Sequence, residues 1–111
     1  AKMARLSKIQ RFHTQAFARF VGKLAAMPDG DGSMLDHSLL LYGSNMSNSN
    51  AHNQYPLPTA LLGKACGRVK GGQHINFDQR TPLANVLLTM LQRSGVSIDK
   101  IGDSTGAIAQ I

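Results

Sequence analysis

The first 27 residues constrain the fold most, because their apolar side chains recur with the period of a helix. The recurring residues are Leu6, Ile9, Phe12, Ala16, Phe17, Phe20, Leu24 and Met27. This spacing predicts an amphipathic α-helix over about residues 2–27 with one buried stripe. Pro28 and the glycines that follow it predict the end of this helix, since proline cannot continue one.

The charge of the chain is concentrated in the same segment. The net charge is +6, from twelve basic and six acidic residues, and all six acids are aspartates. Half of the basic residues precede position 28, where there is no acid: Lys2, Arg5, Lys8, Arg11, Arg19 and Lys23. A nucleic-acid contact is disfavoured, because no nucleic-acid motif and only six aromatic residues accompany these charges. A solvated helix face, or a face docked on an acidic part of a longer protein, is the preferred interpretation.

The length of 111 residues fits a single domain or a C-terminal fragment of a larger α/β domain. A hydrophobic content of 42% and a charged content of 16% indicate a globular chain. The sequence opens inside a helical pattern without an initiator methionine or signal peptide, which favours an excised segment. No apolar run reaches the roughly 18 residues that a membrane-spanning helix needs.

Two short apolar runs predict the strands at the centre of the fold. Ser38–Tyr42 is continuously apolar after its serine, which is typical of a strand buried on both faces of a parallel sheet. Residues 58–63 predict a second strand, and residues 67–77 a hairpin or glycine-linked excursion. The order helix, strand, long loop, strand, hairpin and helix predicts an α/β fold built on a partial, helix-covered sheet.

A second helix is predicted after the hairpin. Thr81 is its expected N-cap, Pro82 its first residue and Gly95 its end. The expected buried stripe consists of Leu83, Val86, Leu87, Met90 and Leu91.

The polar loop over residues 43–53 is the best candidate site. It follows the predicted buried strand, and open α/β sheets bind ligands at the carboxyl ends of their strands. His52 could bind a metal or move a proton, while Ser44, Asn45 and Asn48 offer polar atoms to a ligand. The alternative is an asparagine-rich loop that satisfies its own backbone, and spacing alone favours that alternative.

Other motifs have simpler explanations. Residues 102–106 match G-x-S-x-G, but no histidine or acid follows as a catalytic partner, so a glycine-bounded turn is preferred. Asp29, Asp31 and Ser33 begin like a calcium loop, but Leu40 stands where the closing glutamate is required, so ordinary turn chemistry is preferred. Asp36 and His37 precede the first strand, where capping or turn stabilisation is expected.

Several segments together resemble the C-terminal part of the HxxSHH-motif family of exported bacterial proteins of unknown function. They are Ile9–His13, Pro28–Ser38, Leu41–Ser47, His52, Leu57–Pro58, Leu62–Gly63 and Gly102–Asp103. The resemblance implies a periplasmic or extracytoplasmic location, and a longer protein whose upstream residues supply partners for the basic segment. The histidine-rich motif that names the family precedes the stretch matching Ala1, so this chain lacks it.

That family is in turn similar to the alkaline-phosphatase and sulfatase-like superfamily. By this analogy the chain contributes to a metal-dependent hydrolase-like site, His52 is a ligand of a divalent metal, and Ser44 and Asn48 line the site. The loop departs from such sites, because it has asparagines and no carboxylate between Ser44 and His52. No nucleophile is assigned. The alternative function is a non-enzymatic protein-binding or structural module, whose loop and basic helix contact upstream residues or another chain.

Overall fold

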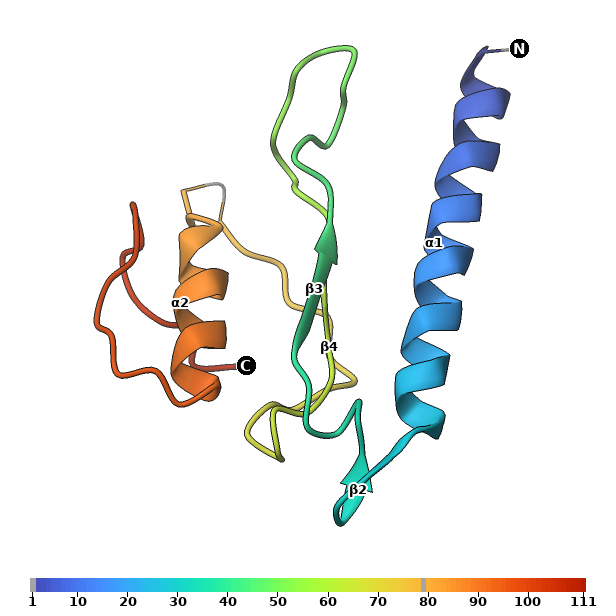
Figure 1. Ribbon diagram of the computed structural model, residues 1–111. Coiled ribbons are helices and arrows are strands. Elements are labelled where there is room, and N and C mark those ends of the chain that lie inside the picture. The colour runs from blue at the N-terminus through green and yellow to red at the C-terminus, as the bar shows by residue number, and fades with distance from the viewer. Residues whose placement is uncertain (1, 79) are drawn as a thin grey trace.

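A computed structural model describes residues 2–78 and 80–111 of the chain. It contains two helices and two small two-stranded antiparallel sheets. The helices are α1 (Lys2–Ala26) and α2 (Ala84–Arg93), and the strands are β1 (Pro28–Asp29), β2 (Gly32–Ser33), β3 (Leu40–Gly43) and β4 (Thr59–Leu62). The β3–β4 hairpin lies between the two helices, which gives three thin layers (Figure 1). The expected mixture of helices and strands is therefore confirmed, and the layers are loosely packed.

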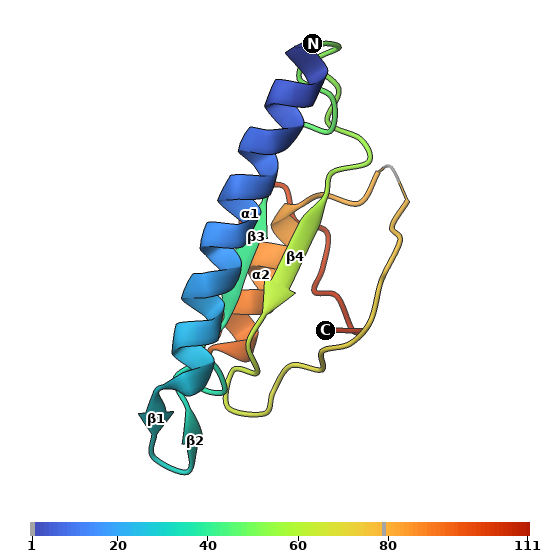
Figure 2. The same ribbon diagram turned by 90° about the vertical axis from the view of Figure 1, so that its right-hand side faces the viewer.

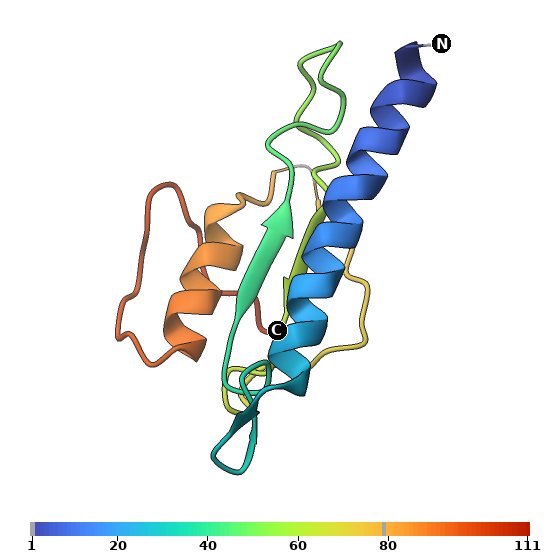
Figure 3. The ribbon, with the colours of Figure 1, turned by 45° about the vertical axis from the view of Figure 1, so that its right-hand side comes forward.

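The helix α1 forms where the apolar period predicts it and ends just before Pro28. The single buried stripe expected for it is wrong, because no described residue of α1 is buried. Only Phe17, Val21 and Leu24 are half-buried, and the Phe17 ring stacks on Tyr42 of β3 with centroids 4.2 Å apart. The sheet is too narrow and too short to cover more of the helix, as Figure 2 and Figure 3 show.

The central strands pair with each other, and not with parallel neighbours. β3 and β4 are antiparallel, with Leu40 opposite Leu62 and Gly43 opposite Thr59. The prediction of a parallel strand buried on both faces is therefore wrong. Leu41 remains 37% exposed, because the sheet has only two strands and no complete layer of other residues covers it.

Gly63 fixes the turn that leaves β4. Its φ is +97°, a backbone conformation that side chains other than glycine rarely adopt. An added Cβ would collide with the carbonyl group of Ser38 and lie 3.1 Å from the carbonyl oxygen of Leu35. The close approach lets the amide of Ala65 donate to the oxygen of Ser38 at 3.1 Å, which ties the exit of β4 to the entry of β3.

Two alternatives were predicted for residues 67–77, and the hairpin is wrong because the structure has no strand there, whereas the glycine-linked excursion is present. This glycine-rich segment instead runs as an extended excursion alongside β4 (Figure 2). A side-chain contact helps to hold it, since Gln73 Nε2 donates to the carbonyl oxygen of Gln110 at 2.6 Å.

The helix α2 starts later than expected. Leu83 is its N-cap and makes no side-chain capping bond, so the assignment of Thr81 as N-cap is wrong. The amide of Thr81 instead donates to the oxygen of Asp78 at 2.9 Å, in a turn that precedes the helix. The end at Gly95 is confirmed: its φ is +91°, and the amide of Val96 donates to the oxygen of Leu91 at 3.0 Å, as in a Schellman motif.

The best-packed part of the molecule lies between α2 and the C-terminal segment. Leu88 and Thr89 are 1% and 2% exposed, and Ile108 is 5% exposed. The predicted stripe is only partly right, because Leu83 and Leu87 are 41% and 36% exposed. The C-terminal segment packs on a different face of the helix. The helical period alone cannot predict this, because it depends on tertiary contacts.

The molecule as a whole is more open than a compact domain of its length. Its radius of gyration is 15.8 Å, against about 13 Å expected for a compact chain of this length. Its accessible surface is 8322 Å². A compact monomer of this mass would expose roughly 5,900 Å², so about 2,400 Å² of additional surface is exposed.

Candidate functional site

The predicted site loop connects β3 to β4 and projects beyond the hairpin (Figure 1). It follows an antiparallel strand, so the rule that places ligands at the carboxyl edge of a parallel sheet does not apply to it. A bridge between Asn48 and Asn53 closes its outer part into a small hairpin-like turn. The amide of Ser47 donates to the oxygen of Asn53 at 2.8 Å within the same turn.

All four candidate residues in this loop are exposed. Asn48 Oδ1 accepts the amides of Asn50 and Ala51 at 3.0 and 3.1 Å, and Ser44 Oγ accepts the amide of Met46 at 3.3 Å. These oxygens therefore stabilise the backbone of the loop, as the alternative interpretation expects. Asn45 faces a groove described below.

His52 lies at the tip of the loop with a φ of +50°. Its ring forms no hydrogen bond with another residue in the described part of the chain. In residues 2–78 and 80–111 no group of three or more His, Cys, Asp or Glu side chains is placed to hold a metal ion. The described residues therefore do not fit a complete metal site, because one imidazole and amide oxygens already engaged with backbone are too few ligands.

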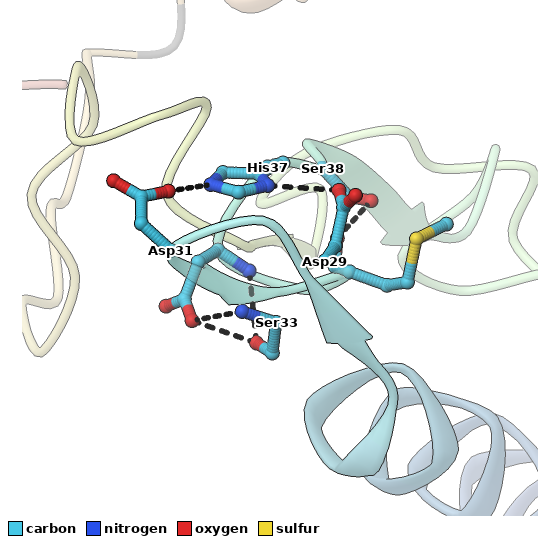
Figure 4. Close-up of polar contacts among 7 residues, drawn as sticks. Asp29, Asp31, Ser33, His37 and Ser38 are labelled. Atoms are coloured by element: carbon cyan, nitrogen blue, oxygen red, sulfur yellow. Dashed lines mark hydrogen bonds and ion pairs between the residues drawn. The ribbon is translucent and has the colours of Figure 1, made fainter.

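A cluster that sequence reasoning assigned only to turn chemistry surrounds His37 (Figure 4). Its Nδ1 lies 2.8 Å from Asp29 Oδ2, and its Nε2 lies 3.2 Å from Asp31 Oδ1. The hydrogen bond with Asp29 raises the pKa of His37, and the charge of Asp31 acts in the same direction. Two carboxylates on opposite ring nitrogens favour the imidazolium, since only that form donates from both nitrogens.

Asp36 forms a second clip beside this cluster. Its Oδ2 accepts the amide and the hydroxyl of Ser33 at 2.9 and 2.7 Å, and its Oδ1 lies 2.8 Å from Lys64 Nζ. The hydrogen bond from Lys64, followed by those from Ser33, lowers the pKa of Asp36 well below its usual range. These contacts confirm the expected turn stabilisation and join the β1–β2 hairpin to the segment after β4.

A groove of about 930 Å³ runs along β4. Sequence reasoning missed it, because it forms between segments that are distant in sequence. Its walls are β4, the extended segment after it, the start of α2 and the end of the chain. Apolar residues lining it include Leu57, Leu61, Ile75, Phe77, Val86 and Ile108.

The backbone of β4 also faces this region. The amide of Ser44 donates to the oxygen of Pro58, so alternation along the antiparallel pair makes Tyr42 opposite Ala60 a hydrogen-bonded pair. The same alternation directs the backbone groups of Thr59 and Leu61 to the outer edge of β4, which has no strand neighbour in the described chain. An unpaired edge of this kind accepts a further strand.

In comparisons with known proteins, no protein-family model, no curated protein and no solved structure matches the chain. No helix among the described residues is long and apolar enough to cross a membrane.

Proposed function

We propose that the chain is a partner-dependent α/β module, whose core is completed by another polypeptide segment. The surplus of about 2,400 Å² of accessible surface carries this proposal. A standard protein interface covers about 800 Å² on each partner, so the surplus corresponds to about three such contacts. The groove and free edge of β4 offer one place for the completing segment. An added strand would form hydrogen bonds with the backbone groups of Thr59 and Leu61, and it would bury the side chain of Leu61.

The resemblance to the HxxSHH-motif family supports an upstream segment of a longer, exported protein as the completing part. On that proposal the module belongs to an alkaline-phosphatase-like sheet located outside the cytoplasm. The continuous apolar run of β3 supports this larger sheet, since it is typical of a strand covered on both faces.

The stability of the 111-residue chain tests the proposal. We expect the purified chain to unfold with less than about 5 kcal/mol, the lower limit for ordinary domains, and to bind a dye specific for exposed apolar surface. Urea unfolding and sedimentation measure the stability and the association state together. A monomer that unfolds cooperatively with about 5–15 kcal/mol would contradict the proposal, because its core would need no completion.

We also propose that His52 supplies one ligand to a divalent metal whose other ligands lie on the completing segment. The family resemblance, which implies a metal ligand at His52, supports this second function, and the exposed ring leaves room for ligands from another segment. The chain has its own controls, because His13 and His74 are exposed histidines elsewhere. In an NMR titration with Zn²⁺, the ring signals of His52 should shift at lower metal concentration than those of the two controls. Equal responses from the three rings would remove His52 from the metal site.

A further inference from the structure

The helix α1 carries two apolar sides, and the β3–β4 hairpin contacts only one of them. Phe17, Val21 and Leu24 form the half-buried side, and the ring of Phe17 stacks on Tyr42 of the hairpin. A second line of residues, which we call the outer seam, consists of Ile9, Phe12, Ala16 and Phe20. Because successive helical residues are about 100° apart, the outer seam lies roughly a quarter turn from the packed side.

The outer seam is exposed along its whole length. Ile9, Phe12 and Phe20 are 53%, 64% and 48% exposed, and Ala16 is also exposed. Its spacing of three, four and four residues is that of a narrow helix–helix seam, and the small Ala16 near its centre permits close approach of a second helix. The seam is therefore shaped for another helix.

The charges around the outer seam define the partner. Arg5 and Lys23 are about five turns apart, so they lie on one side of the helix close to the two ends of the seam. Arg19 lies on the flank between them. Among the described residues no ion pair involves α1, whose twenty-five residues include no acid. These charges are unmatched within the chain and complement carboxylates.

We propose that the outer seam of α1 binds an acidic amphipathic helix, with apolar residues on the seam and carboxylates opposite Arg5, Arg19 and Lys23. Like charges disfavour a second copy as the occupant. An antiparallel pair of seams would place Arg5 beside Lys23 of the second copy, and a parallel pair would place each cation beside its equivalent. This surface is distinct from the groove along β4, so either proposal can fail without the other.

A bilayer surface and nucleic acid fit this face less well. A helix lying on a membrane separates its basic side from its apolar side, whereas Arg5 and Lys23 interrupt the apolar side itself. Nucleic acid would match the cations but would leave Phe12 and Ile9 facing phosphates. Only a polypeptide with both apolar and acidic side chains matches the whole face.

Fluorescence anisotropy with a designed probe tests the proposal. The probe is a labelled helical peptide with leucines at the spacing of the seam and glutamates on both flanks, compared with a scrambled peptide of equal composition. We expect saturable binding of the probe and not of the scrambled peptide. Phe12→Gln should weaken binding about tenfold or more, as expected for a central apolar contact. Met3→Gln is the matched control, because Met3 is 82% exposed on the same helix but away from the seam.

Charge reversal separates the proposal from its alternatives. The double variant Arg5→Glu, Lys23→Glu should lose the acidic probe and bind a probe whose flanking glutamates are lysines. Circular dichroism verifies that each variant keeps its helix. The proposal is overturned if the double variant binds the acidic probe as wild type does, or if wild type does not bind it. Tighter binding to phosphatidylglycerol vesicles or duplex DNA, or dimerisation through the seam, would also overturn it.

Discussion

The hydroxyl of Thr89 is one of the contacts that hold the C-terminal segment, residues 96–111, on α2. It donates to the carbonyl oxygen of Asn85 at 2.7 Å and accepts the amide of Ile108 at 2.8 Å. Thr89 and Ile108 are 2% and 5% exposed, so water cannot readily replace the hydroxyl as the partner of this amide. Thr89→Val keeps the shape of the side chain and leaves the amide of Ile108 without its acceptor.

A buried donor without a partner costs about 1–3 kcal/mol. Since about 1.4 kcal/mol corresponds to a factor of ten, the amide of Ile108 should exchange with solvent about 5 to 140 times faster in Thr89→Val. Hydrogen exchange followed by NMR measures this local opening without requiring the whole chain to unfold in one step.

Thr89→Ser is the matched control, because it keeps the hydroxyl and removes only a methyl group. Its effect on the exchange of the Ile108 amide should be clearly smaller than that of Thr89→Val. Equal exchange in Thr89→Val and wild type would refute this account of the C-terminal segment. So would a serine variant that exchanges as fast as the valine variant, because packing of the methyl group would then be the cause.

Three further changes test other contacts. Gly63→Ala should lower the free energy of unfolding by about 3 kcal/mol in a thermal unfolding assay, because the positive φ and the backbone collision act together. Gly67 has a φ of +82° with open space around it, so Gly67→Ala should lower the free energy of unfolding by less in the same assay. The pKa of His37 is raised, so its contribution to stability should be complete below the ordinary value of 6.5 and lost as pH rises through the folded pKa. An NMR titration of its ring beside unfolding midpoints measured against pH checks this, and His37→Gln should remove the dependence. Tyr42→Ala should weaken the docking of α1 by about 1 kcal/mol beyond the loss of buried area, because the stacked Phe17 ring loses its partner; proteolysis of α1 that is no faster in this variant would contradict the prediction.

The sequence predicted the polar loop that carries the candidate site, but not the three-dimensional placement of the residues around it. The serines and asparagines over residues 43–53 already indicate a long polar connection, and the structure has one there. The prediction that this loop lies at the ligand-binding edge of a sheet assumed parallel strands. It does not hold, because β3 and β4 are antiparallel. The groove along β4 could not be predicted, because its walls come from segments as distant in sequence as Leu57 and Ile108.

The sequence alone determined the elements that depend on local physics. The apolar period specified α1, and Pro28 specified its end. The two short apolar runs specified the central strands, and Gly95 specified the end of α2. Each follows from backbone geometry and solvation within a few residues.

Only the tertiary structure decided which apolar faces are covered. Leu88 and Thr89 are buried because the C-terminal segment packs on their side of α2, whereas Phe12 remains exposed because no described segment reaches the outer seam. An amphipathic pattern shows that burying the apolar face of a helix lowers the free energy of the fold. Which segment buries that face is decided by the packing of the whole molecule.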